Sequence, residues 1–230
     1  MNSTNRTARI AGLLYLLMAV ASIFGLNIPG GFIVRGDAAA TADKIASSHL
    51  FYRLCIVSDL ASQILFVFLV LALYQLLKGV NERQAALMVA LVLVQVPMTF
   101  ANMLCGIAPL VLLNRADYWS AFDKRQLDAL TMGFLSFRSY GISAVTALWG
   151  LWLLPFGLLV FRSGFIPRIL GILLIAGCFA DLAISMTSLL FPAYAHLANK
   201  LLVLGVGEIL TIFWLLIKGA KAQPLATVGP

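Results

Sequence analysis

Residues 140–177 read YGISAVTALWGLWLLPFGLLVFRSGFIPRILGILLIAG, and this stretch decides the fold class. It consists of two apolar runs joined by a short basic turn, Arg162–Arg168. In that turn, Gly164 is suited to end one helix and Pro167 to begin the next. An apolar helix of about 20 residues is long enough to cross the hydrocarbon core of a bilayer. The stretch therefore predicts two membrane-spanning helices connected by a tight turn.

The composition of the whole chain extends this interpretation to a membrane bundle. Of 230 residues, 62% are hydrophobic and 11% are charged, with a mean hydropathy of +0.99. Soluble proteins carry about 25% charged residues, so a soluble domain is excluded, as are disorder, collagen and a disulfide scaffold. We expect an all-α, polytopic six-helix transmembrane bundle that forms a single integral membrane domain over residues 1–230. The expected spans are residues 10–27, 50–77, 85–113, 128–161, 167–190 and 197–217.

The net charge of +7 does not indicate nucleic-acid binding. Lysine and arginine occur singly between apolar runs, whereas nucleic-acid-binding proteins gather them on one face or tail. Six spans place both termini on one side of the membrane. The Lys and Arg counts of the two sides are equal, so the positive-inside rule gives no decision. We expect cytoplasmic termini because the loops on that side are shorter and more densely basic.

Several helix boundaries follow from capping residues. Asp37 is expected to cap a short helix that runs towards Ser48. Asn81 and Asp123 each stand three residues before a glutamine, which is the spacing of a capping box. Gly79 is expected to end the second span in the left-handed conformation.

Two spans contain features that predict irregular helices. Pro97 lies inside the third span, where it predicts a kink, and a polar loop with Tyr118 follows. A continuous helix over residues 123–161 would be about 57 Å long, whereas a bilayer core is about 30 Å thick. We therefore expect its first turns to lie outside the core, or the helix to break near Gly133 or Gly141.

The chain resembles an uncharacterised bacterial multi-pass family, domain of unknown function 4386. The stretches that carry the resemblance are residues 140–177, ARIAGLLYLL (8–17), GDAAATADKI (36–45), FYRLCIVSDL (51–60) and LYQLLKGVN (73–81). The resemblance implies a bacterial integral membrane protein, which we expect in the inner (plasma) membrane. It implies no reaction and no catalytic residue, so any function has to be inferred from the residues themselves.

Six polar residues stand out because of their expected depth in the membrane. Counting about 1.5 Å per residue from the basic end of each helix places the acids and an asparagine within the core and two arginines at one rim. Ionised groups are costly at membrane depth, so we expect them to face the bundle interior. There they would line a polar funnel that opens on the arginine side. These candidate ligand-binding residues are Asp59, Asp181, Glu208, Asn102, Arg53 and Arg138.

The candidate residues permit three functions. We favour binding or transport of a small or lipid-like molecule through the funnel, within the lipid bilayer. One alternative is an intramembrane enzyme that uses an Asp/Glu pair on a lipid substrate. The other is a structural or partner-binding protein whose buried charges only hold helices together, as an Asp59 pair with Arg53 or Arg138 would.

The sequence argues against cofactor and metal chemistry. His49 and His196 are expected near membrane boundaries, so they form neither a haem pair nor a set of zinc ligands. No phosphate-binding or dinucleotide-binding motif occurs. We therefore expect no cofactor, no metal and no catalytic residue. Whether Cys55 pairs with Cys105 is left open, and so is the oligomeric state.

Overall fold

The computed structural model describes residues 3–114 and 119–220, and these residues contain helices and turns but no strand. The predicted all-α class is confirmed. In chain order the elements are α1 (Ser3–Phe32), α2 (Ala38–Ser47), α3 (His49–Leu77), α4 (Glu82–Leu112), α5 (Lys124–Leu151), α6 (Leu153–Ser163), α7 (Arg168–Leu190), the short 3-10 helix η2 (Pro192–Tyr194), α8 (Ala195–Ala198), the 3-10 helix η3 (Asn199–Gly205) and α9 (Val206–Ile217).

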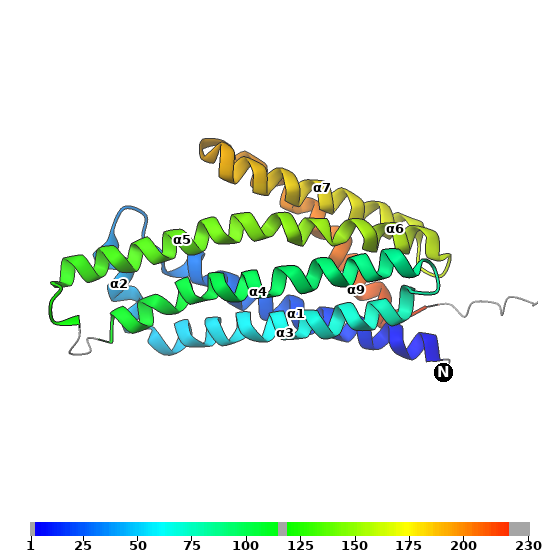
Figure 1. Cartoon of the computed structure of the whole chain (residues 1–230), viewed down its shortest axis with the longest axis horizontal. Helices are drawn as coiled ribbons and strands as arrows, with labels where there is room; N and C mark the ends of the chain where they lie inside the picture. The colour runs from blue at the N-terminus through cyan, green and yellow to red at the C-terminus, as the bar shows by residue number, and fades with distance from the viewer. Residues whose placement is uncertain (1–2, 115–118, 221–230) are drawn as a thin grey trace, which may run out of the picture.

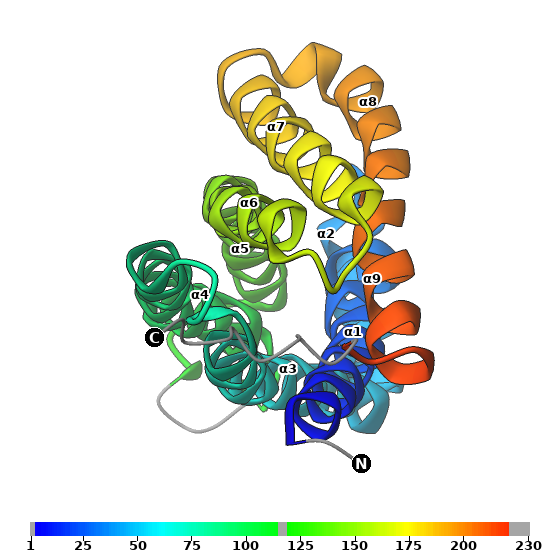
Figure 2. The same cartoon turned by 90° about the vertical axis from the view of Figure 1, so that its right-hand side faces the viewer.

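The helices arrange as an elongated bundle. In Figure 1, α1, α3, α4 and α5 run along the long axis, while α2 lies at one end and α7 diverges from the others. The end view in Figure 2 shows α9 beside α1, on the side of the bundle away from α4. Helix α1 packs on α3, α3 on α4, α4 on α5, and α7 on both α5 and α6.

Within the described residues, six segments are long and apolar enough to cross a membrane. They coincide with the six predicted spans, although the first begins at Thr4 and the last already at Pro192. Many large apolar side chains on these helices point outward, and Phe137 and Leu190 are 67% and 66% exposed. Such faces suit contact with lipid tails rather than water, because lipid solvates them without a hydrophobic penalty.

The long fourth span is divided, but not where the glycines predicted. Its 40 residues, Lys124–Ser163, run without interruption through Gly133 and Gly141. The interruption falls at Trp152, between α5 and α6. The cause is Pro155, which has no amide hydrogen to donate to the carbonyl of Leu151 four residues earlier. The prediction of a break near either glycine was therefore wrong.

The predicted caps are mostly present. The Asp37 side chain accepts a hydrogen bond from the amide of Ala40, and the Asn81 side chain accepts one from Gln84. Asp123 and Gln126 form a complete capping box. Gly164 is left-handed, with a φ of 72°. In the third span, α4 continues as one helix through Pro97. Tyr118, in the loop that follows, lies outside the described residues.

Gly79 does not adopt the predicted left-handed conformation. Left-handed glycines in the described part of the chain are Gly36, Gly164 and Gly219. After α3 ends, the amide of Val80 donates to the carbonyl of Leu77 at 2.9 Å. A tight turn of this kind needs no positive φ, so the third span can follow directly.

Close helix contacts are made through glycines. At the crossing of α6 and α7, a Cβ on Gly157 would lie 2.8 Å from the carbonyl oxygen of Gly171. A Cβ on Gly171 would in turn lie 2.6 Å from the carbonyl oxygen of Gly157. Because membrane helices gain little from the hydrophobic effect, this close van der Waals packing is a main source of their association.

This crossing gives a matched test of packing. We expect Gly157→Ala to destabilise the protein by about 1–3 kcal/mol, because the added methyl group overlaps the α7 backbone. Gly133→Ala is the control, since no atom lies within 4 Å of the methyl group that it adds. Thermal unfolding in detergent should show a lower midpoint for Gly157→Ala only. Equal midpoints for the two variants would contradict this account of the crossing.

Candidate functional site

The polar candidates gather into two clusters. The first, here the Arg138 cluster, contains Asp59 on α3, Asn102 on α4 and Arg138 on α5. The second, here the Glu208 cluster, contains Tyr15 on α1, Asp181 on α7 and Glu208 on α9. The sequence predicted one common funnel for six candidates, which also include Arg53, whereas the structure divides them between these two clusters and leaves Arg53 outside both.

A buried ion pair forms the centre of the Arg138 cluster. The Nη2 atom of Arg138 lies 2.7 Å from Oδ2 of Asp59, and the two side chains are 2% and 14% exposed. The Nδ2 atom of Asn102 donates to the main-chain carbonyl of Arg138 at 3.2 Å. The pair therefore joins α3 to α5, and the asparagine adds α4. Of the two partners that the sequence offered to Asp59, the structure selects Arg138.

Three glycines provide the space that this cluster occupies. A Cβ on Gly25 of α1 would lie 2.9 Å from the Cβ of Asp59, and one on Gly106 would lie 3.2 Å from Nη1 of Arg138. A Cβ on Gly141 would overlap the side-chain oxygen of Asn102. Each member of the cluster thus faces a glycine of a neighbouring helix. Sequence reasoning missed this role and treated Gly141 only as a site for a helix break.

The Arg138 cluster is closed rather than open to an outward funnel. The cavity beside Asp59, Asn102 and Arg138 has a volume of about 10 Å³, which is close to the minimum needed for one water molecule. Tyr52 is buried and donates to the carbonyl of Gly106 at 2.6 Å, which holds α3 against α4. The prediction that Arg138 stands at a water-exposed rim was therefore wrong, because depth along a helix does not reveal which way a side chain points.

Arg53 does not belong to either cluster. It is exposed on α3 and makes no ion pair within residues 3–114 and 119–220. Six residues separate Arg53 from Asp59, and this spacing turns their side chains about 120° apart around the helix axis. When Asp59 faces α5, Arg53 therefore points elsewhere.

The Glu208 cluster joins the three helices α1, α7 and α9. The hydroxyl of Tyr15, which is 1% exposed, donates to Oε2 of Glu208. Asp181 interacts electrostatically with both residues. The two carboxylic side chains are partly buried. A glycine again provides the space, since a Cβ on Gly150 of α5 would lie 2.8 Å from the Cβ of Asp181.

Two local irregularities position this cluster. Trp152, at the break between α5 and α6, packs edge-on against Tyr15 with ring centroids 6.1 Å apart. Glu208 lies in the first turn of α9, directly after the seven-residue 3-10 helix η3. The predicted single helix over 197–217 is thus made of several pieces. A 3-10 segment of this length is uncommon and often marks a hinge.

The two clusters differ in charge compensation. Asp59 has Arg138 as its partner, but neither Asp181 nor Glu208 makes an ion pair with any residue that the structure describes. Two acids close together, without a cation, repel one another when both are ionised. Such a site favours binding a proton or another cation, because either one removes the repulsion and the cost of a charge at membrane depth.

The remaining chemical candidates form neither a disulfide nor a metal-binding group among the residues that the structure describes. Cys55, Cys105 and Cys178 are free thiols, so Cys55 and Cys105 do not form a disulfide. No group of three metal-binding side chains occurs in the part of the chain that the structure describes. His196 contacts the carbonyl of Ala193 through Nδ1. Ser185 donates to the carbonyl of Ser143 at 2.7 Å and thereby links α7 to α5.

Six apolar spans with an ionisable interior define this chain as a multi-pass membrane protein. Residues 10–219 match the family described as Domain of unknown function (DUF4386), and the chain belongs to that family. This finding confirms the family resemblance seen in the sequence. Comparisons with curated proteins and with solved structures gave no match.

The ion pair gives a second stability test. We expect Asp59→Asn and Arg138→Met each to cost about 3–5 kcal/mol, because each leaves the other residue without its charged partner in the interior. The double variant should lose less than the sum of the two single losses. Reversible unfolding in mixed micelles would measure all three.

Arg53→Met is the matched control for this test. It removes a cation from the same bundle, but at an exposed position, so its effect should stay within about 0.5 kcal/mol. If the Arg138→Met variant lost no more stability than this control, the pair would not hold α3 to α5.

Proposed function

We propose that this protein binds or transports a small or lipid-like molecule across the membrane, with the Glu208 cluster exchanging a proton or another positive charge. The observation that carries the proposal is that two carboxylates within electrostatic range of each other, Asp181 and Glu208, make no ion pair in the described structure. Ionisable residues within membrane spans commonly mark substrate and ion pathways.

Tyr15 supports a role in proton exchange. Its hydroxyl donates to Glu208 from a fully buried position, so it fixes the orientation of one carboxylate oxygen. A carboxylate held in this way accepts a proton or a cation on its other oxygen without rearranging. Protonation removes the charge and the cost of keeping it in a low-dielectric interior.

The Arg138 cluster supports a role as a barrier in the same pathway. The cavity beside its ion pair has room for little more than a water molecule. In this proposal the structure is a closed state, and a passage opens on that side only when α3 and α5 separate. Arg53 has no place in the pathway, because it points away from the cluster.

The location of the protein is part of the proposal. We propose that it resides in a bacterial inner membrane with both termini in the cytoplasm and that residues 1–230 form one domain. The family resemblance supports the bacterial origin, and the shorter, more densely basic loops support the orientation.

One observation also favours a second function. Asp181 and Glu208 come from helices far apart in sequence, yet they lie within electrostatic range of one another. An acid and a base at such a distance are what an intramembrane enzyme would need to act on a lipid. Formation of a new product from bilayer lipid by the purified protein would favour this alternative over transport.

Proton-driven uptake of ethidium into proteoliposomes tests the transport function. With a pH gradient across the membrane, the wild-type protein should accelerate uptake of this aromatic cation. Glu208→Gln should abolish the acceleration, because the glutamine side chain cannot exchange a proton. Tyr15→Phe should reduce it by roughly ten- to a hundredfold, which corresponds to the loss of one hydrogen bond to a charged group.

Glu82→Gln is the control with the same chemical change. Glu82 also accepts a hydrogen bond from a tyrosine, Tyr74, at 3.2 Å, but at an exposed helix end. This variant should take up ethidium at the wild-type rate. Uptake that is independent of the pH gradient, or unchanged in a folded Glu208→Gln variant, would overturn the proposal.

A further inference from the structure

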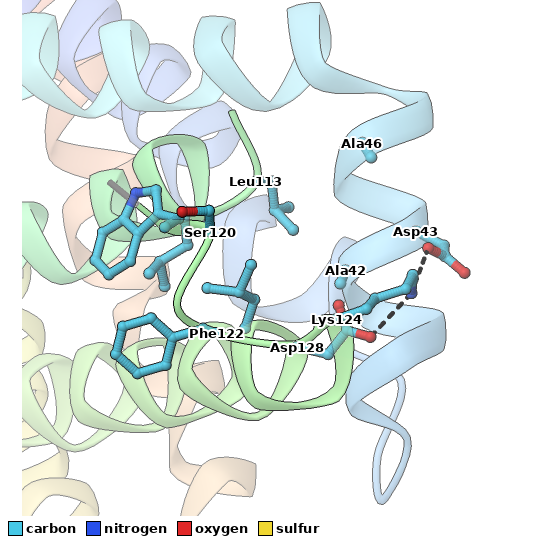
Figure 3. Close-up of a pocket in the computed structure, with 11 residues that line it drawn as sticks. Ala42, Asp43, Ala46, Leu113, Ser120, Phe122, Lys124 and Asp128 are labelled. Atoms are coloured by element: carbon cyan, nitrogen blue, oxygen red, sulfur yellow. Dashed lines mark hydrogen bonds and ion pairs between the residues drawn. The ribbon is translucent and has the colours of Figure 1, made fainter. Parts of the chain in front are cut away.

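A second site lies at the end of the bundle where α2 packs against the start of α5. Here a pocket of about 390 Å³ opens among α2, the end of α4 and the first turns of α5, as Figure 3 shows. This volume falls within the range of small-molecule binding sites. Its apolar lining consists of Ala42, Ala46, Leu112, Leu113, Trp119, Phe122 and Leu127.

The polar side of the pocket is built from Ser120 and three charged residues. Lys124 lies between Asp43 of α2 and Asp128 of α5, with its Nζ atom 3.2 Å and 2.9 Å from the two carboxylates. The Asp128 side chain is only 6% exposed, whereas that of Asp43 is 69% exposed. The lysine therefore ties α2 to α5 and fixes both carboxylates at the pocket wall.

The net charge of this polar wall determines which sign of ligand charge is favoured. Two carboxylates and one ammonium group leave one net negative charge. The ammonium group of Lys124 already contacts both acids, so an anion has to compete with two carboxylates for it. A ligand with a positive group gains attraction from the net charge without displacing any existing contact.

The apolar wall of the pocket favours a ligand that also carries an apolar group. Trp119 and Phe122 lie with ring centroids 5.8 Å apart. Aromatic faces also attract alkylammonium groups through cation–π interactions. Helix α4 ends at Leu112 and α5 begins at Lys124, so the pocket lies at the end of two membrane spans, where tryptophan is frequent. An amphiphile can enter here with its apolar part still at the level of the lipid.

We propose that this pocket binds an amphiphilic cation, with an amine or quaternary ammonium group beside Asp43 and Asp128 and an apolar group against Trp119 and Phe122. The site is separate from the Glu208 cluster and does not depend on the transport proposed above. The same chemistry is found in lipid amine headgroups and in free alkylamines.

Tryptophan fluorescence tests the pocket with two probes that differ in the sign of their charge. Protein in phosphatidylglycerol nanodiscs is titrated with hexyltrimethylammonium and, separately, with hexanesulfonate. The cation should change the fluorescence in a saturable manner, and the sulfonate should not. The change should disappear in Trp119→Phe, because the other tryptophans lie outside the pocket.

Two charge variants should change the affinity for the cation in opposite directions. Asp43→Asn should weaken binding of the cation at least about fivefold, since a charge at 4 Å contributes about 1 kcal/mol even in water. Lys124→Gln should strengthen it, because the wall becomes more negative. Lys44→Gln, which changes an exposed neighbour outside the pocket, should have no effect. The exposed Asp43 is preferred to Asp128 because its change does not disturb a buried group.

Several outcomes would overturn the proposal. They are stronger binding of hexanesulfonate, a signal that survives in Trp119→Phe, or equal affinities for Asp43→Asn, Lys124→Gln and the wild type. If the cation binds as expected, nanodiscs that contain phosphatidylethanolamine identify the source of the natural ligand. Weaker apparent binding there indicates competition by the lipid amine, whereas unchanged binding indicates a free alkylamine.

Discussion

The ion pair between Arg138 and Asp59 is the interaction on which the helix arrangement depends. A charge inside a membrane bundle is costly unless a partner compensates it, so α3 and α5 have to lie where the Arg138 side chain can reach Asp59. Asn102 adds α4 to the same point, and Gly25, Gly106 and Gly141 let the backbones approach closely enough. The ion pair and the three glycines thus depend on one another, because the polar side chains occupy space that larger residues at the glycine positions would fill.

The same principle distinguishes the Glu208 cluster. Here too a glycine, Gly150, provides the space for a polar side chain. The partner of Glu208, however, is a tyrosine hydroxyl that donates a hydrogen bond, not a cation. A compensated pair is suited to hold helices in place, whereas an uncompensated pair of acids retains the capacity to take up charge. This difference is why we place the candidate function at Asp181 and Glu208 and a structural barrier at Arg138.

The division of the fourth span connects these two regions. Pro155 interrupts the helix at Trp152, and Trp152 packs against Tyr15, the hydrogen-bond donor to Glu208. Farther towards its start, the same span presents Arg138 to Asp59 and Lys124 to the pocket beneath α2. One helix therefore contributes to all three polar regions, and its length beyond the bilayer thickness allows the last of them to lie at the membrane boundary.

The sequence by itself determined the six spans, most caps and three partly buried acids, Asp59, Asp181 and Glu208, because hydrophobicity, capping and charge act locally or over one helix. It also offered Arg138 as one of two possible partners for Asp59, but it did not predict the burial of that arginine, the exclusion of Arg53 or the pairing of Tyr15 with Glu208. These depend on the rotation of each helix about its axis, and only packing against neighbours fixes that rotation. The tertiary structure alone decided which glycines face which polar groups, since such contacts join residues that are distant in the chain.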